Sequence, residues 1–272
     1  MRLKLHIFCA LLLLSVIAPQ AYAQSEQVQA KHAKVELLSS GHVLSQDTVL
    51  GVHFVLEKGW HIYWINPGDS GQPPSFTWQM PAGFTAGEVL WPLPERLQSS
   101  PSIADYGYKD DVVLMVPLHF LASAKTNRSS EIGVKAKWLI CREVCIPDHA
   151  SLKVSTGSEA NASTQELFAR TKKLIPRPWP VKWKVSVESR RNEFLLTIET
   201  GKEISIAEFF PLDAGQIENS AKQRVAPTPH GARISLQKSD LLLTPISRVR
   251  GVLVIPGQGA YQVAAPVAMQ AR

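Results

Sequence analysis

The chain has 272 residues, of which 45% are apolar and 19% are charged, and its formal net charge is +6. This balance is typical of a globular protein, and it excludes a disordered chain, a coiled coil and a polytopic membrane protein. The length is typical of about two domains. The 19 prolines and 16 glycines indicate many turns rather than long helices.

The first 23 residues have the features of a secretory signal peptide. Arg2 and Lys4 precede an apolar stretch over residues 7–18, which is too short to span a membrane comfortably. A small-x-small cleavage pattern follows at residues 21–23, so we expect the mature chain to start at Gln24 in an oxidising compartment. Cleavage would remove two positive charges and lower the formal charge from +6 to +4.

The excess of basic residues does not indicate a nucleic acid partner. Lysines and arginines are scattered among acidic residues, without a run of about five or six like charges. Export makes nucleic acid a still less suitable partner. We therefore interpret the charge as a solvated surface and expect no nucleic acid binding.

Short runs of alternating apolar and polar residues predict a mature chain that is mostly β. Turn signals such as Asn66-Pro67-Gly68-Asp69 separate these runs. Many short strands with frequent turns are typical of β-sandwiches. The alternating runs cover residues 52–57, 134–140, 182–187, 194–198 and 233–237.

One segment, residues 164–174, predicts a helix instead. Ser163 is its expected N-cap, and Glu166 follows three residues later. Prolines at positions 176, 178 and 180 would end it. Its expected apolar stripe consists of Leu167, Phe168 and Leu174.

A small, polar stretch before this helix is the expected domain boundary. The chain then divides into four parts. These parts are a signal peptide (1–23), a first β domain with both mature cysteines (24–157), a helical and proline-rich linker (158–178) and a second β domain (179–272).

Cys141 and Cys145 are the residues best suited to chemistry, because two thiols this close in an oxidising compartment tend to pair. Residues four apart on an extended strand lie about 13 Å apart, so the chain has to curl between them. Pro147 would help to end that curl. The alternation of the preceding strand places Cys141 on the face of Lys135 and Lys137, away from the core, where a partner thiol could reach it.

Three interpretations of the pair stay open. A purely structural disulfide is the weaker interpretation, because in the loop-entropy model a disulfide that closes a ring of about five residues stabilises the folded protein by only about 2 kcal/mol. Redox exchange suits the chemistry better. Metal binding would use Cys141, Cys145 and His149, a set that suits Cu(I) or Zn(II), although Pro147 disfavours the helix that would align them. Without a metal, His149 would be an exposed loop residue or a modest influence on the Cys145 thiolate.

Two further segments bear on the cysteines. Tyr106, Gly107 and Tyr108 lie in a polar stretch that could fold over a nearby site, or both tyrosines could pack on their own sheet. Residues 59–71 predict a strand that leads into a tight turn, with tryptophans in the core, and a sugar-binding platform is a weaker alternative. The sequence shows no Ser–His–Asp hydrolase pattern and no Gly-rich phosphate loop.

Together these segments resemble the amino-terminal periplasmic domain of the DsbD family of thiol:disulfide interchange proteins. The closer likeness is to its ScsB-like branch, which is linked to suppression of copper sensitivity. The resemblance covers about residues 35–154, and Phe209-Phe210-Pro211 also looks like the ScsB-like branch. The matching motifs are WHIYW at 60–64, NPGDSG at 66–71, WPLP at 91–94, YGY at 106–108 and the cysteine segment at 138–147.

The resemblance implies an immunoglobulin-like sandwich in which Cys141 and Cys145 shuttle between dithiol and disulfide. Tyr106, with Gly107 and Tyr108, would belong to a cap loop that shields the pair. The implied location is the periplasm. The implied partners are a membrane electron carrier, here a separate protein, and periplasmic disulfide isomerases or thioredoxin-like proteins.

We therefore expect an all-β protein of two immunoglobulin-like β-sandwich domains joined by a short helical linker. Its expected function is thiol–disulfide interchange of the protein-disulfide reductase type, with Cys145 as the attacking residue. No organic cofactor and no metal are expected. The alternative is a non-catalytic binding module, such as a copper-handling one, with a purely structural disulfide.

Overall fold

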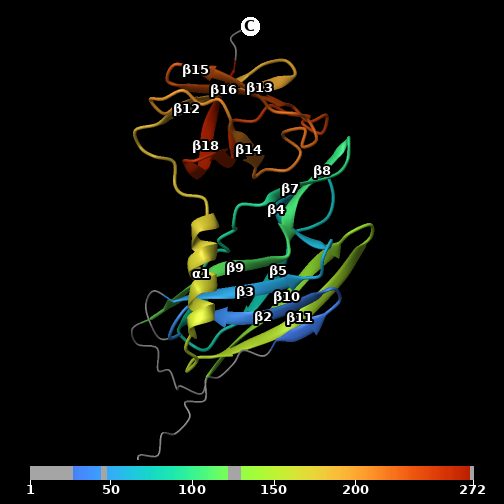
Figure 1. Ribbon diagram of the computed structural model, residues 1–272, viewed down its shortest axis with the longest axis vertical. Helices are drawn as coiled ribbons and strands as arrows, with labels where there is room; N and C mark the ends of the chain where they lie inside the picture. Colours follow the sequence, from blue (N-terminus) through green and yellow to red (C-terminus); the bar gives the residue numbers. More distant parts are fainter. Residues whose placement is uncertain (1–26, 44–47, 122–129, 270–272) are drawn as a thin grey trace, which may run out of the picture.

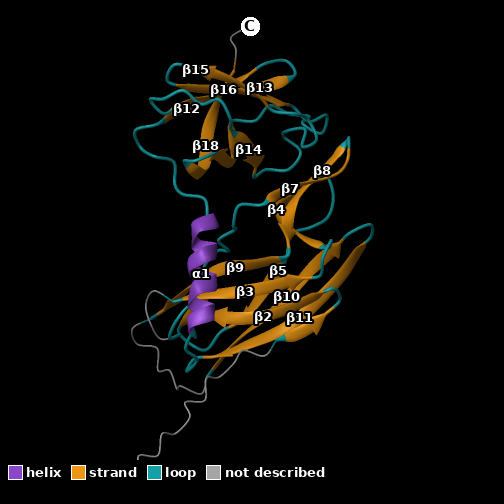
Figure 2. Ribbon diagram, viewed as in Figure 1, coloured by secondary structure: helices purple, strands orange, loops and turns teal. Residues whose placement is uncertain are grey.

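The computed structural model describes residues 27–43, 48–121 and 130–269, so the expected signal peptide and its cleavage site lie outside the described residues. The described residues form eighteen strands in three sheets and one helix (Figure 2). The predicted all-β class of sandwich-like sheets is therefore confirmed. Within the described ranges, no helix has the length and apolar character that a membrane crossing requires.

Two sheets pack face to face in the part of the chain that precedes the helix, which we call the amino-terminal lobe (residues 27–156). The first sheet, in spatial order, consists of β1 (Val28–Ala30), β2 (Ala33–Ser39), β3 (Val49–Leu56), β9 (Asp111–Phe120) and β6 (Phe84–Ala86). The second consists of β11 (Cys145–Ser155), β10 (Glu131–Cys141), β4 (His61–Gly68), β8 (Ile103–Lys109) and β7 (Glu95–Ser100), with β5 (Ser75–Gln79) also paired to β10.

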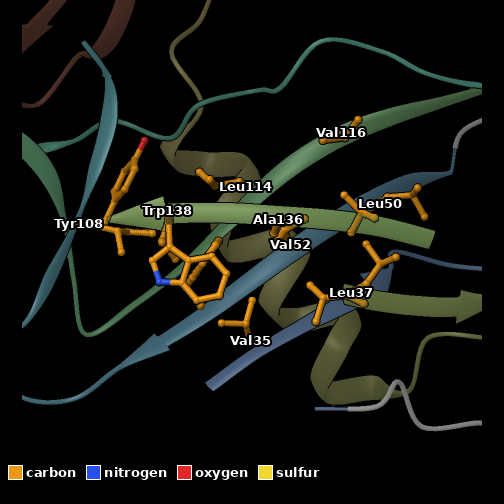
Figure 3. Packing of buried hydrophobic residues seen from close by; sticks show 14 of the residues in the cluster. Val35, Leu37, Leu50, Val52, Tyr108, Leu114, Val116, Ala136 and Trp138 are labelled. Carbon is orange, nitrogen blue, oxygen red and sulfur yellow. The ribbon is translucent and has the colours of Figure 1, made fainter. Parts of the chain in front are cut away.

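Apolar side chains from both sheets fill the space between them, as the alternation predicted. Val52 and Phe54 of β3 are fully buried, and so are Ala136 and Trp138 of β10. Phe54 and Trp138 meet edge to face with ring centroids 5.2 Å apart. Figure 3 shows the Trp138 side chain pointing from β10 into this cluster, towards Val35 of β2. Because such rings bury large apolar areas, truncating one to alanine would destabilise the lobe by about 3–5 kcal/mol.

Helix α1 (Ala162–Leu174) begins earlier than the sequence predicted. Its N-cap is Asn161, whose side-chain oxygen accepts a 2.8 Å hydrogen bond from the backbone N–H of Thr164. The prediction of Ser163 as N-cap is wrong, because that residue already lies inside the helix and its hydroxyl donates to Asn161. The predicted end at Leu174 is confirmed, two residues before a proline.

The buried face of α1 packs on the outer surface of the first sheet. Phe168 and Thr171 are the buried residues of the helix, and Phe168 clusters with Val113 and Met115 of β9. Leu174, predicted in the same stripe, is 50% exposed instead. The last turn of α1 extends beyond the sheet towards the rest of the chain (Figure 1), which explains this exposure.

The remaining strands form one seven-stranded sheet in what we call the carboxy-terminal lobe (residues 179–269). This lobe has a hydrophobic core of its own, which contains apolar residues of the predicted runs 194–198 and 233–237. A parallel pair, β12 with β18, joins its two halves. In spatial order the sheet consists of β14 (Glu208–Pro211), β17 (Arg248–Ile255), β18 (Gly259–Met269), β12 (Lys184–Ser189), β13 (Glu193–Glu199), β16 (Gly231–Gln237) and β15 (Arg224–Thr228).

The two lobes share apolar contacts. Phe210 and Val252 of the carboxy-terminal lobe belong to the core cluster of the amino-terminal lobe. The Phe210 ring lies edge-on to Trp64 and Tyr106, with centroids 6.4 and 5.5 Å away. The carboxy-terminal lobe therefore packs directly on β4 and β8, although the exact domain bounds stay a prediction.

Candidate functional site

The two cysteines close a β-hairpin. Strands β10 and β11 pair from Glu131 opposite Ser155 to Cys141 opposite Cys145. A disulfide joins the two cysteines, whose Cα atoms lie 4.2 Å apart. The predicted curl between them is therefore confirmed, as the tight turn of residues 142–144.

Pro147 does not end this curl, contrary to the prediction. It lies inside β11, opposite Leu139 of β10. Strand β11 is at the end of the sheet order, so among the described strands it has a ladder partner on one side only. A proline is tolerated there because an edge strand does not need every N–H.

The two sulfur-bearing residues differ in exposure. Cys145 is exposed at the end of the hairpin, whereas Cys141 is only 2% exposed. The prediction that Cys141 faces a partner is therefore wrong, although it does lie on the outer face of the sheet. Other side chains on that face cover it.

Tyr63 of β4 is the main candidate for this cover. Its hydroxyl oxygen lies 3.4 Å from Cys145 Sγ, and the hydroxyl donates because a disulfide sulfur has no proton. Since neighbouring strands lie about 4.8 Å apart, a side chain that starts on β4 and ends beside β11 crosses over β10, the strand of Cys141. Burial raises the pKa of Tyr63, and the nearby Asp105 adds to this effect, so the hydroxyl keeps its proton at neutral pH.

His61 lies beside Cys141 in the same sheet. It is the Cα partner of Cys141 on one side and of Lys109 on the other. Burial lowers the pKa of His61, while Asp105 acts in the opposite direction and Lys109 adds to the lowering. The imidazole is therefore neutral at neutral pH. Its Nε2 atom is buried and has no hydrogen-bond partner among the residues that the structure describes.

The last residues of β4 and the turn that follows them, which together we call the covering turn (residues 66–71), lie against the Tyr63 ring. A Cβ atom added to Gly71 would lie only 2.1 Å from Tyr63 Cζ, so only a glycine fits this close to the ring. Ser70 Oγ lies 3.5 Å from the Tyr63 hydroxyl oxygen. The backbone N–H and hydroxyl of Ser70 donate to the carboxylate of Asp105, at 2.8 and 2.9 Å. Tyr63 is thus confined between the disulfide and this turn.

An aromatic stack lies beside the hairpin turn. The rings of His32 and Trp60 are stacked with centroids 3.8 Å apart, and the guanidinium carbon of Arg142 lies 5.2 Å from the centre of the Trp60 ring. Val144, next to Cys145, is 63% exposed. The exposed sulfur therefore has a cation and an apolar side chain as near neighbours in the chain.

The residues of the expected cap loop lie in strand β8, so their predicted position in a loop is wrong. The strand forms because residues 103–109 pair with β4 and β7 on both sides. Tyr106 packs against Trp64, and the Tyr108 hydroxyl donates to the carbonyl of Pro92 at 2.8 Å. Burial raises the pKa of both tyrosines.

Gly107 alone of the three alternates to the outer face. It is the Cα partner of Tyr63, and a Cβ atom there would lie 2.3 Å from the carbonyl oxygen of Ile62. Only a glycine therefore fits this close to the backbone of β4. Its two tyrosine neighbours point into the core, where Figure 3 shows Tyr108 at the margin of the buried cluster.

His149 lies away from the disulfide. It is exposed on β11, opposite Lys137, and four residues along a strand correspond to about 13 Å from Cys145. The alternative ligand set of both cysteines and His149 is therefore not brought together. In the described part of the chain, no group of three or more His, Cys, Asp or Glu residues could hold a metal ion.

The sequence interpretation missed Tyr63, Ser70 and Asp105. It predicted the strand and turn over residues 59–71 correctly, and both tryptophans are buried as expected. The alternation of β4 offered a signal, because Ile62 and Trp64 occupy the core face and so place Tyr63 on the outer face.

Comparisons with known proteins identify a family to which part of the chain is similar. Residues 27–156 match the family model described as "Thiol:disulfide interchange protein DsbD, N-terminal". None of the curated protein sequences matches the chain significantly.

A solved structure also resembles the chain. It is the N-terminal periplasmic domain of ScsB from Proteus mirabilis, with a TM-score of 0.68 and 18% sequence identity. The match covers 87% of this chain and 94% of that chain, so the shared fold extends over both lobes. The resemblance that the sequence motifs indicated is thus confirmed: residues 27–156 match the family model of the DsbD amino-terminal domain, and the fold is similar to that of the ScsB domain.

Proposed function

We propose that the protein exchanges disulfides with other proteins through Cys141 and Cys145, as a protein-disulfide reductase-type interchange protein. The observation that carries this proposal is the asymmetry of the disulfide. Cys145 is exposed next to a hydroxyl donor, whereas Cys141 is buried beneath the outer face of the sheet. A purely structural staple needs no such difference between its two sulfurs.

The exchange proceeds through a mixed disulfide. A thiolate of a reduced partner attacks Cys145 Sγ, the bond to Cys141 breaks, and Cys141 leaves as a thiolate that takes up a proton. The second thiol of the partner then loses its proton and displaces Cys145, which leaves as the second thiol. The partner becomes a disulfide, and the protein has gained two electrons and two protons, which the reverse sequence passes to the next partner.

The surrounding residues assist this chemistry in different ways. The Tyr63 hydroxyl, protonated at neutral pH, donates to the Cys145 sulfur and stabilises the thiolate that leaves from Cys145 when the mixed disulfide is resolved. The covering turn, rather than residues 106–108, acts as the cap over the pair. His149 has no role in the step, because it lies too far along β11.

The proposed partners follow from the family match and the signal-like amino terminus. They are periplasmic thiol–disulfide proteins, such as a disulfide isomerase or a thioredoxin-like protein, and a membrane electron carrier. The periplasm is the proposed location, since residues 1–23 have the pattern of a cleaved signal peptide. The similar domain of ScsB from Proteus mirabilis is periplasmic, which supports the same location.

Trapping of mixed disulfides tests the proposal. In Cys141→Ser, the exposed Cys145 has no resolving thiol, so it should accumulate mixed disulfides with periplasmic proteins on non-reducing gels. Cys145→Ser leaves only the buried Cys141 and should capture far less. The double serine variant, which has no thiol in the mature chain, is the control.

The reduction potential of the wild-type disulfide provides an independent measurement. A structural bridge has a potential below about −300 mV, and an exchanging one lies higher. A potential below that limit, together with no captured protein in a folded Cys141→Ser variant, would contradict the proposed function.

A further inference from the structure

The covering turn determines how freely Tyr63 can move. The Gly71 backbone packs on the Tyr63 ring, and Ser70 lies beside its hydroxyl. For the ring to leave the Cys145 sulfur, the turn has to shift. Whatever holds the turn therefore also holds the cover over the disulfide.

Part of the turn is held from within the amino-terminal lobe. Ser70 donates twice to Asp105, and one carboxylate oxygen of Asp69 accepts a 2.7 Å hydrogen bond from the backbone N–H of Ala104. These hydrogen bonds hold the covering turn against the first residues of β8.

The rest of the turn is held by the carboxy-terminal lobe. The Asn219 amide donates to the other carboxylate oxygen of Asp69 at 2.7 Å, and the Asn66 amide donates to the carbonyl of Pro211 at 2.8 Å. Both asparagines are buried. The bond to Asp69 is part-buried and has a carboxylate acceptor, which makes it stronger than a hydrogen bond between neutral groups, and the bond from Asn66 to Pro211 is buried.

A continuous set of contacts therefore runs from one lobe to the other. It starts at Asn219, passes through Asp69 and Ser70 of the covering turn, and ends at Tyr63 and the Cys145 sulfur. Asp69 and Asn219 are 150 residues apart in the sequence. The contact thus exists only because the lobes pack together.

We propose that Asn219 is a positioning residue that holds the covering turn against Tyr63, so that the carboxy-terminal lobe limits how fast the Cys141–Cys145 disulfide is reduced. This inference rests on the proposed function for its biological meaning, but the rate itself is measurable without a protein partner. It gives the carboxy-terminal lobe, which has no cysteine, a defined effect on the site.

Reduction by dithiothreitol is the direct test, in the full chain. A reagent thiolate attacks Cys145 Sγ, Cys141 leaves, and the second reagent thiolate closes a ring disulfide, so two electrons and two protons pass to the protein. In Asn219→Ala the turn loses one anchor, Tyr63 separates from the sulfur more often, and the rate should rise on the order of fivefold. Asn219→Ser is the second variant. Its side chain is too short for the hydroxyl to replace the amide, so its disulfide should also be reduced faster than that of wild type.

Arg96→Met is the matched control. It removes another hydrogen bond between the lobes, from the Arg96 guanidinium to the carbonyl of Ala221 at 3.1 Å, but this bond starts on β7 rather than on the turn. Its reduction rate should stay within about twofold of wild type, because the turn keeps its anchors. An increase equal to that of Asn219→Ala would show general loosening of the lobes and would overturn the inference.

A double-mutant cycle with Tyr63→Ala separates positioning from stability. If Asn219 acts through Tyr63, Asn219→Ala should have no further effect once the ring is absent. A full additional increase in the Tyr63→Ala background, or an unchanged or lower rate in both single Asn219 variants, would contradict the inference.

The two proposals can fail separately. If the wild-type protein never exchanges with a dithiol protein such as reduced thioredoxin, the proposed function fails, while the effect of Asn219 on reduction by dithiothreitol can still be measured. If the wild-type protein exchanges and folded Asn219 variants react at its rate, only the role of the carboxy-terminal lobe is wrong.

Discussion

The hydroxyl of Tyr63 reaches across strand β10 to donate to the sulfur of Cys145, 3.4 Å away. The contact joins residues that are 82 positions apart, one on an inner strand and one at the end of a hairpin. It has two physical consequences for the disulfide. The ring lies over β10, the strand of the buried Cys141, and the hydroxyl offers a hydrogen bond to the negative charge that forms on Cys145 when a mixed disulfide at this residue is resolved.

Tyr63→Phe separates these two effects, since it removes the hydroxyl and keeps the ring. Without the donor, the pKa of the Cys145 thiol should rise by roughly one to two units, because hydrogen bonds to charged groups are worth about 1.5–3 kcal/mol. The pH dependence of iodoacetamide alkylation, measured in a Cys141→Ser background, reports this pKa. An alkylation curve that does not move would show that the hydroxyl does not stabilise the thiolate.

Tyr108→Phe tests the expected cap role of residues 106–108. This substitution removes the buried hydrogen bond to the Pro92 carbonyl, so the free energy of unfolding should fall by about 1 kcal/mol. The dithiothreitol reduction rate of the disulfide should stay at the wild-type value, because the ring lies in the core rather than on the outer face. Chemical denaturation and a reduction time course measure the two quantities. A rate increase without loss of folding would favour the cap role.

Gly71→Ala should displace the covering turn. The new methyl group would lie 2.1 Å from Tyr63 Cζ, and the residue has a φ of 76°. Strain in the left-handed region and overpacking together should lower the free energy of unfolding by about 2–4 kcal/mol. The disulfide should also be reduced faster than in wild type, as a dithiothreitol time course would show.

Gly201→Ala is the matched control for that substitution. Gly201 has a similar φ of 88°, but nothing lies within 4 Å of an added Cβ atom. Its free energy of unfolding should fall only by the cost of the left-handed backbone conformation, about 1–2 kcal/mol. Its disulfide should be reduced at the wild-type rate. Equal stability losses in both variants would show that the contact between Gly71 and Tyr63 is loose.

His61 should make the stability of the protein depend on pH. Burial holds its pKa below the 6.5 of an unfolded chain, with Asp105 and Lys109 of β8 as the nearby charges. The unfolded state therefore binds the proton more readily, so this contribution to stability is present above pH 6.5 and is lost as the pH falls towards the folded pKa.

Urea unfolding of wild type and His61→Gln between about pH 5 and pH 8 measures this dependence. The free energy of unfolding of His61→Gln should fall less steeply towards acid pH than that of wild type. His149→Gln, at an exposed position on β11, is the control and should keep the wild-type profile. Parallel profiles for wild type and His61→Gln would mean that burial does not disfavour the protonated imidazole.

Local sequence patterns predicted much of the fold, but they could not identify the covered cysteine. The alternation over residues 134–140 gave the buried face of β10, because side-chain direction in a strand has a period of two. The prediction failed for Cys141, because its burial depends on β4 pairing beside it, with His61 as its Cα partner. That pairing joins residues far apart in the chain, and no local pattern specifies it.

The same limit explains one further error at the site and one contact that the sequence did not indicate. Residues 106–108 contain a glycine between aromatics in polar surroundings, which is compatible with a loop until β4 and β7 supply partners on both sides. The contact between Asn219 and Asp69 depends on how the two lobes meet. The predicted turn at residues 66–69 is wrong for its first three residues, because β4 continues to Gly68, which pairs with Asp105 of β8.

The hairpin that carries the two cysteines continues as a paired ladder for the full length of β10 and β11. When the bond between the sulfurs opens, the backbone pairing still keeps the two thiols adjacent, at a high effective concentration. A visiting protein attached to Cys145 would therefore be released quickly by Cys141. Intermediates of the wild-type protein should be short-lived, and the rigid ladder makes rapid turnover, rather than tight retention of a partner, the natural outcome of each encounter.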